Sequence, residues 1–89
     1  MDFAQFESIQ KADGHDEVLV REWAPDFSND THTHPFDTHV LVVRGEFWLS
    51  TQGKTIHFKA GDHFDLPRNQ PHSERYGPEG ATFWAARKN

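Results

Sequence analysis

The stretch from Thr31 to His39 reads THTHPFDTH, and it carries three of the seven histidines of the chain within eight residues. A fourth histidine, His72, ends a second distinctive stretch, Gly61–His72, which reads GDHFDLPRNQPH. Because residues i and i+2 of a strand point to the same face, about 6.5–7 Å apart, His32 and His34 should converge on one side. Two ring nitrogens placed in this way can reach one metal ion.

His39 lies at an odd offset from His34, so a continuous strand would turn it to the opposite face. We expect Pro35–Asp37 to break the strand and let His39 re-enter from the next one. His72 can join this group only through tertiary folding, and a solvated polar loop is the alternative interpretation of the cluster. The remaining histidines are expected to be ordinary surface or hydrogen-bonded residues: His15, His57 and His63.

The size and composition of the chain predict one small folded domain over residues 1–89. Only 35% of the 89 residues are hydrophobic, and the mean hydropathy is -0.83. Eight Phe, three Trp and one Tyr nevertheless supply the large apolar surfaces that disordered segments lack. No cysteine is present, which leaves imidazole and carboxylate groups as metal donors.

The charge and hydropathy of the chain argue against two classes of partner. A net charge of -5 disfavours nucleic acid, because phosphate binding needs a basic patch. No apolar run approaches the roughly 20 residues that span a bilayer, and the N-terminus lacks the pattern of a signal peptide. We therefore expect a cytoplasmic protein with no membrane partner.

Residues 2–13 are predicted to form a short N-terminal helix. Asp2 can cap this helix, with Gln5 three positions later to complete a capping box. One side of the helix is apolar, and we expect it to lie over the edge or mouth of a sheet. That side carries Phe3, Phe6 and Ile9.

From Val18 onward the pattern is typical of short strands separated by turns. A polar loop is expected at residues 26–30, a break at Gly45, and a turn at residues 77–80. Seven or eight short strands after one helix predict an all-β antiparallel sandwich or barrel. The expected strands are Val18–Trp23, His39–Arg44, Glu46–Ser50, Lys54–Lys59, His63–Leu66, His72–Tyr76 and Thr82–Arg87.

The whole pattern resembles the cupin superfamily, whose first motif is H-x-H, then three or four residues, Glu, and later a glycine. The positions that correspond here are His32, His34, His39 and Gly45. The second motif is G-D, a short strand, P-x-G, two residues, His, then three residues and Asn. Its matches are Gly61, Asp62, Pro67 and His72. The sequence departs from both motifs, because His39 stands for Glu, and Asn69 and Tyr76 stand for Gly and Asn.

The resemblance implies a jelly-roll cupin β-barrel over residues 18–87, with a metal ion inside it near its open end. The implied ligand set is His32, His34, His39 and His72, and Asp37 is the alternative carboxylate ligand. Such a set suits a divalent transition metal, among which Fe, Mn, Ni and Zn are not distinguished. The resemblance also implies a homodimer.

Strand parity predicts the surroundings of the ion. Glu74 and Tyr76 share the face of His72, so both are candidate catalytic residues, with Glu74 as an acid or base. A rim carboxylate paired with Arg75 or Arg68 is the alternative role for Glu74. An aliphatic wall is expected from the face that carries His39, Leu41 and Val43. Four aromatic residues could close the pocket or belong to an ordinary core: Phe36, Phe47, Trp48 and Trp84.

Three functions fit these observations, each with a small molecule or a metal as the partner. The first is a metal-dependent enzyme of the dioxygenase or isomerase type, for which the fold alone is weak support because it hosts many chemistries. The second is a non-enzymatic module that binds or senses a small ligand or a metal. The third is a structural metal site that stabilises a small barrel.

Overall fold

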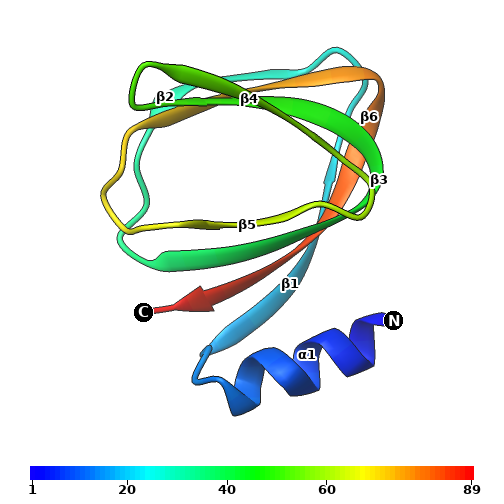
Figure 1. Ribbon diagram of the computed structural model, residues 1–89, viewed down its shortest axis with the longest axis vertical. Helices are drawn as coiled ribbons and strands as arrows, with labels where there is room; N and C mark the ends of the chain where they lie inside the picture. The colour runs from blue at the N-terminus through cyan, green and yellow to red at the C-terminus, as the bar shows by residue number, and fades with distance from the viewer.

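A computed structural model describes all 89 residues as one helix followed by six antiparallel strands. Figure 1 shows the strands wrapping around a common centre, with the helix outside them. The predicted all-β barrel with one short N-terminal helix is confirmed. The elements are α1 (Phe3–Ala12), β1 (Glu17–Trp23), β2 (Ser28–His32), β3 (Asp37–Thr51), β4 (Lys54–Lys59), β5 (His63–Leu66) and β6 (His72–Lys88).

Two long strands, β3 and β6, pair with each other along most of their length and form the frame of the barrel. The first part of β3 and the last part of β6 lie between β5 and β1. The other parts of the same two strands lie between β4 and β2. The barrel therefore consists of two four-stranded sections that share β3 and β6.

The predicted strand break at Gly45 and the predicted turn at residues 77–80 are both wrong. The pairing of β3 with β6 shifts between Val42 and Arg44 and again between Gly45 and Phe47, but the strands continue on both sides. Gly45 has a φ of +75°, a conformation that bends a strand without ending it. Gly45 and the turn-like residues 77–80, which suggested four short strands, thus mark the bend between the two sections of the barrel.

A second difference concerns the polar loop expected at residues 26–30. Ser28–His32 forms the edge strand β2, which pairs with the first part of β6. The sequence SNDTH lacks the alternation of apolar and polar residues by which strands are predicted. An edge strand beside a cavity does not need an apolar face, so this alternation is not required here. This strand delivers His32 to the site.

The N-terminal helix begins with the predicted capping box, in which the Asp2 side chain accepts from the Gln5 backbone amide and the Gln5 side chain accepts from the Asp2 amide. The helix packs on the outer face of the sheet and does not cover the mouth of the barrel (Figure 1). Phe3 and Phe6 contact Trp84, with ring centroids 5.6 and 5.5 Å apart. Ile9 remains 52% exposed. This helix is too short and too polar to cross a membrane.

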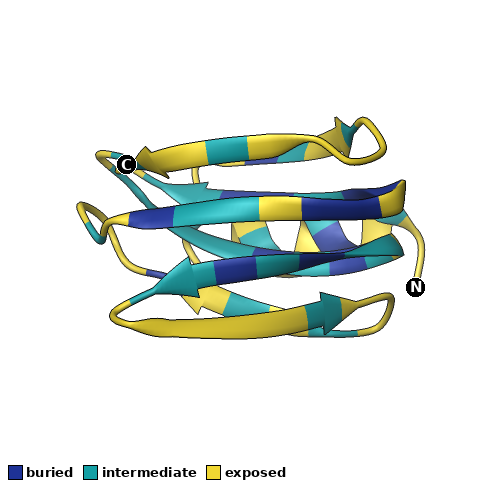
Figure 2. Cartoon of the chain, turned by 90° about the horizontal axis from the view of Figure 1, so that it is seen from above, coloured by how far each residue is buried: buried dark blue, intermediate teal, exposed yellow.

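The interior of the barrel holds a largely aromatic cluster. Buried residues are concentrated on the middle strands, and the outermost strands are mostly exposed (Figure 2). The buried members of the interior cluster are Val42, Phe47, Leu49, Tyr76 and Ala81. Phe47 and Leu49 also line a cavity, so the core forms part of the floor of the candidate site.

Candidate functional site

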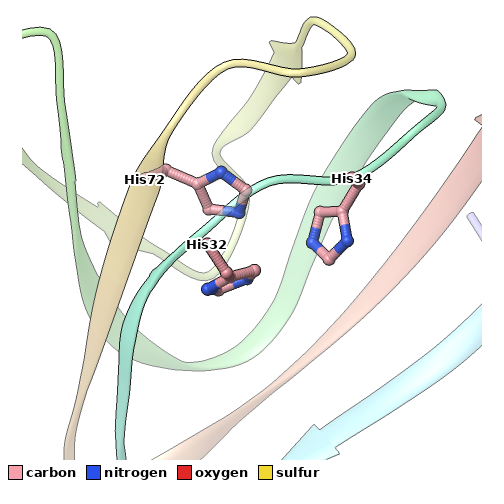
Figure 3. A group of neighbouring side chains, drawn as sticks. All are labelled: His32, His34 and His72. Atoms are coloured by element: carbon pink, nitrogen blue, oxygen red, sulfur yellow. The ribbon is translucent and has the colours of Figure 1, made fainter.

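Three histidines from two neighbouring segments converge inside the barrel (Figure 3). His32 ends β2 and His72 begins β6, and the two are direct partners in the sheet. His34 follows in the connection from β2 to β3. The ring centroids lie 4.3 Å apart for His32 and His72, 4.9 Å for His32 and His34, and 5.1 Å for His34 and His72. One candidate ligand atom from each ring lies within 4.8 Å of the others.

Backbone contacts orient two of these rings in the same way. The Nδ1 atom of His32 lies 2.6 Å from the carbonyl oxygen of Asp30, and that of His72 lies 2.9 Å from the carbonyl oxygen of Gln70. A neutral imidazole that donates from Nδ1 keeps the lone pair of Nε2 free for a metal ion. The Nε2 atom of His72 is buried and has no hydrogen-bond partner. An unsatisfied buried acceptor of this kind is suited to bind a cation.

The environment keeps the third ring neutral. Burial is the main cause that lowers the pKa of His34 to about 4, and the neighbouring His32 and His72 add to the effect. A neutral imidazole is the form that binds metal.

The structure does not bring His39 into this cluster, so its expected place in a four-histidine set is corrected. His39 lies within β3, where its ring faces outward, stacks on Phe6 and places Nδ1 2.7 Å from a carboxylate oxygen of Asp65. Its strand neighbours Thr38 and Val40 line the cavity instead. Because β3 begins at Asp37, Pro35–Asp37 does not shift the parity of His39 as expected.

Asp37 also lies outside the cluster. Its carboxylate accepts hydrogen bonds from the backbone amide and the guanidinium of Arg68. The backbone hydrogen bond from Arg68 is the main cause that lowers the pKa of Asp37.

Glu74 lines the cavity directly beside the histidines. Its carboxylate oxygens lie 3.5 Å from Nε2 of His72 and 3.9 Å from Nε2 of His32. Burial raises the pKa of Glu74, while His72 and His32 act in the opposite direction. The alternative pairing of Glu74 with Arg75 or Arg68 is not formed, since Arg68 binds Asp37 and Arg75 lies over the ring of Trp48. An acid–base role for Glu74 stays a prediction.

Tyr76 lies deeper, within the interior cluster. Its ring packs against Trp23 and Phe47 at centroid distances of 5.2 and 5.4 Å, and the residue is 1% exposed. Burial is also the main cause that raises the pKa of its hydroxyl. Tyr76 is not among the residues that line the cavity, and a catalytic role for it stays a prediction.

The cavity at the histidine cluster has a volume of about 100 Å³ and a mostly apolar wall. Of the four aromatic candidates, Phe36 and Phe47 line it, whereas Trp48 and Trp84 lie on the outer face against His57 and Phe6. The prediction of an aliphatic cavity wall that includes Leu41 is wrong, because Leu41 packs under α1 against the cluster of Phe6, Val18 and Ala86.

Sequence reasoning missed four polar residues of the cavity wall: Arg21, Asn29, Thr38 and Arg87. Arg21 ends the apolar run Val18–Val20 and shares the parity of Trp23, which is a usable signal. Asn29 lies in the strand that was expected to be a loop. No local pattern distinguishes Arg87 from an ordinary arginine near the end of a strand.

Comparison with known proteins gives one family match and one short local match. Residues 14–86 match a family model described as the AraC-like ligand binding domain. A segment of 36 residues, 40% of the chain, is 53% identical to an uncharacterized HTH-type transcriptional regulator of Haemophilus influenzae. That segment covers 12% of the regulator.

Solved structures share the architecture. A Rhizobium leguminosarum protein of unknown function matches with a TM-score of 0.74 and 26% identity over 79% of the chain. An uncharacterized Klebsiella pneumoniae protein with a double-stranded β-helix domain matches with a TM-score of 0.67 and 29% identity, also over 79%. The chain spans 66% and 64% of these two proteins. A cupin superfamily protein of Desulfitobacterium hafniense shares the fold with a TM-score of 0.68 and 15% identity.

Proposed function

This chain belongs to the family of AraC-like ligand-binding domains and has the cupin fold, and from this premise we propose that its cavity binds a small molecule together with a divalent transition-metal ion. The ion would be held by His32, His34 and His72. The observation that carries the proposal is the convergence of three imidazole ligand atoms within 4.8 Å of one another. The buried Nε2 of His72, which has no hydrogen-bond partner, also supports it.

The donor set limits the identity and the role of the ion. Imidazole ligands suit Fe, Mn, Ni or Zn and disfavour Mg and Ca. Three protein ligands leave at least one position open, whereas structural sites are usually closed by four. A bound ion would therefore supply a Lewis acid to which a small ligand can attach. This argues for a ligand-binding role over a purely structural one.

A sensing role is favoured by the family match and by the local likeness to a transcriptional regulator. The second candidate is a metal-dependent enzyme of the dioxygenase or isomerase type, and Glu74 is the residue that favours it. A half-buried carboxylate beside the histidines can take or give a proton in the cavity. Turnover of a substrate that is lost in Glu74→Gln, with metal content unchanged, would favour the enzyme.

The proposal includes three further expectations: that residues 1–89 act as one domain, that the protein is cytoplasmic, and that it forms a homodimer. Small cores gain stability from a partner subunit. Light scattering of the purified chain measures the oligomeric state.

Elemental analysis of the untagged protein tests the metal site. We expect close to one transition-metal ion per chain in the parent protein and loss of most of it in His32→Ala and His72→Ala, because each variant removes a ligand. His57→Ala is the matched control, since His57 is exposed and pairs with Glu46 on the outer face. Equal metal content in all four proteins would contradict the site.

A further inference from the structure

Two arginines project from the wall of the cavity, and neither is explained by the metal site. Arg21 of β1 and Arg87 of β6 both line the cavity. They share strand parity with Trp23 and Ala85, which line it as well. Arg21 is exposed and Arg87 is half-buried, and each guanidinium group carries a fixed positive charge.

The contacts of Arg87 within the chain leave part of its donor capacity unused. Its guanidinium carbon lies 4.4 Å from the centroid of Phe36, and one terminal nitrogen lies 3.8 Å from a carboxylate oxygen of Glu17. Its Nε is buried and has no hydrogen-bond partner. Phe36 in turn stacks on His34 with centroids 4.9 Å apart, which places Arg87 beside the histidine cluster.

Arg21, unlike Arg87, has no acidic partner. Its guanidinium carbon lies 5.2 Å from the centroid of Trp23, and it takes part in none of the ion pairs of the chain. Glu74 is the one carboxylate of the cavity wall, and it lies against His32 and His72. The wall therefore carries two fixed positive charges and one carboxylate, which favours an anionic ligand.

The size and polarity of the cavity narrow the class of anion. A volume of about 100 Å³ is far below the roughly 300–1,000 Å³ of sites for drug-sized ligands, so the cavity suits a small ligand. Nine of its 17 lining residues are hydrophobic. A short aliphatic chain would use this wall, whereas inorganic phosphate has no apolar part to bury.

We propose that the cavity binds a short-chain carboxylic acid, with the carboxylate held by Arg21 and Arg87 and the short chain packed against the apolar wall. The inference rests on the proposed small-molecule function and names the class of its ligand. Arginine suits this role because its planar guanidinium pairs with a carboxylate through two parallel hydrogen bonds.

Isothermal titration calorimetry of the metal-loaded chain tests the inference with a defined set of probes. The acids are propanoate, pyruvate and malonate, the neutral matched probe is propanamide, and inorganic phosphate is the other anion. We expect at least one acid to bind, and to bind at least about tenfold more tightly than propanamide and phosphate, because a charge-assisted hydrogen bond is lost with the neutral probe.

Variants identify the residues that hold the carboxylate. We expect Arg87→Gln and Arg21→Gln each to weaken binding of that acid by about tenfold or more, with metal content unchanged. Arg75→Gln is the matched control, since Arg75 lies outside the cavity over Trp48, and it should bind the acid as the parent does. Circular dichroism shows whether each variant is folded, and Arg21→Gln, on a separate strand, still tests the inference if Arg87→Gln unfolds.

Three results would overturn the inference: no acid binding at millimolar concentration, propanamide or phosphate bound as tightly as the acids, or unchanged affinity in both cavity variants. Titration of the same acids into the metal-free protein distinguishes failure of the acid-binding inference from failure of the proposed metal site. If the chain takes up no metal but still binds an acid through the arginines, the inference is supported and the proposed metal site is contradicted. If the chain takes up metal at the histidines but binds no acid, the metal site is supported and the inference is contradicted.

Discussion

Local contacts orient two rings of the candidate site and keep the third ring neutral. His32 and His72 are each oriented by the backbone carbonyl two residues earlier, so the same local contact occurs on two different strands. His34 has no such contact and is kept neutral by burial and by its two neighbours, which lower its pKa to about 4. A neutral imidazole such as that of His34 is the form that receives a cation.

This protonation pattern predicts a pH dependence for the metal-free protein. The pKa of His34 is about 4 in the folded chain, against 6.5 as its ordinary value, so the unfolded state takes up the proton first. The stability that this difference contributes is fully present above about pH 6.5 and is lost progressively as the pH falls to about 4. We expect the melting temperature to fall across that window.

Melting curves of His34→Gln at about pH 7 and about pH 4 isolate this contribution. The fall in melting temperature should be smaller in His34→Gln than in the parent protein. It should be unchanged in His63→Gln, because His63 is exposed and lies outside the cluster. An equal fall in all three proteins would show that other groups control the acid sensitivity.

At the scale of the elements, the barrel depends on the close approach of β3 and β6 at their bends. Gly45 of β3 and Gly80 of β6 both have positive φ values, of +75° and +70°. A Cβ built on Gly45 would overlap the carbonyl oxygen of Gly80 and approach the Cα of Ala81 to 2.9 Å. These backbone atoms have little room to move, so glycine at position 45 allows the two sections to meet.

Gly45→Ala should therefore destabilise the protein strongly, and Gly53→Ala provides the comparison. Gly53 has the same φ of +75°, but nothing lies within 4 Å of a Cβ at that position. We expect Gly53→Ala to cost about 1–2 kcal/mol from the left-handed backbone alone. Gly45→Ala should cost about 1–3 kcal/mol more, because the strands must separate.

Urea unfolding of the two variants measures this difference in free energy. Similar unfolding free energies for Gly45→Ala and Gly53→Ala would mean that β3 and β6 can separate at the bend without cost. The metal content of Gly53→Ala should match that of the parent, because Gly53 lies in the β3–β4 turn, away from the three histidines.

At the scale of the whole molecule, two apolar clusters lie on opposite faces of the same sheet. The interior cluster around Phe47 and Tyr76 lies next to the cavity. The outer cluster joins Phe6 of α1 to Val18 and Ala86, with Trp84 packed against it. A substitution in the outer cluster should thus lower the free energy of unfolding without disturbing the candidate site.

Phe6→Ala tests this separation. Phe6 is 2% exposed, and truncation of a buried Phe costs about 3–5 kcal/mol. We expect a large loss of unfolding free energy in urea, with the metal content of the folded protein preserved, because Phe6 lies outside the cavity. Ile9→Ala is the control on the same helix, and since Ile9 is 52% exposed, its effect should stay within about 0.5 kcal/mol. Loss of metal from folded Phe6→Ala would show that the two faces are coupled.

The sequence by itself determined the features that depend on near neighbours. The capping box of Asp2 and Gln5 involves residues three apart, so it was predicted correctly together with the helix. Strands β1, β4 and β5 follow from local alternation and turn residues. The motif resemblance also selected His32, His34 and His72, the three histidines that the structure brings together.

Only the tertiary structure decided which face of each long strand points inward. His39 lies outside the histidine cluster because pairing of β3 with β5 and β6 turns it toward Asp65 and Phe6. Its odd offset from His34 was a local signal for this orientation, but only the structure shows that Pro35–Asp37 does not shift its parity. Arg21 and Arg87 enter the cavity for the same reason. Residues i and i+1 of a strand are locally equivalent until distant segments cover one side, so the inner wall of a barrel is a property of its long-range pairing.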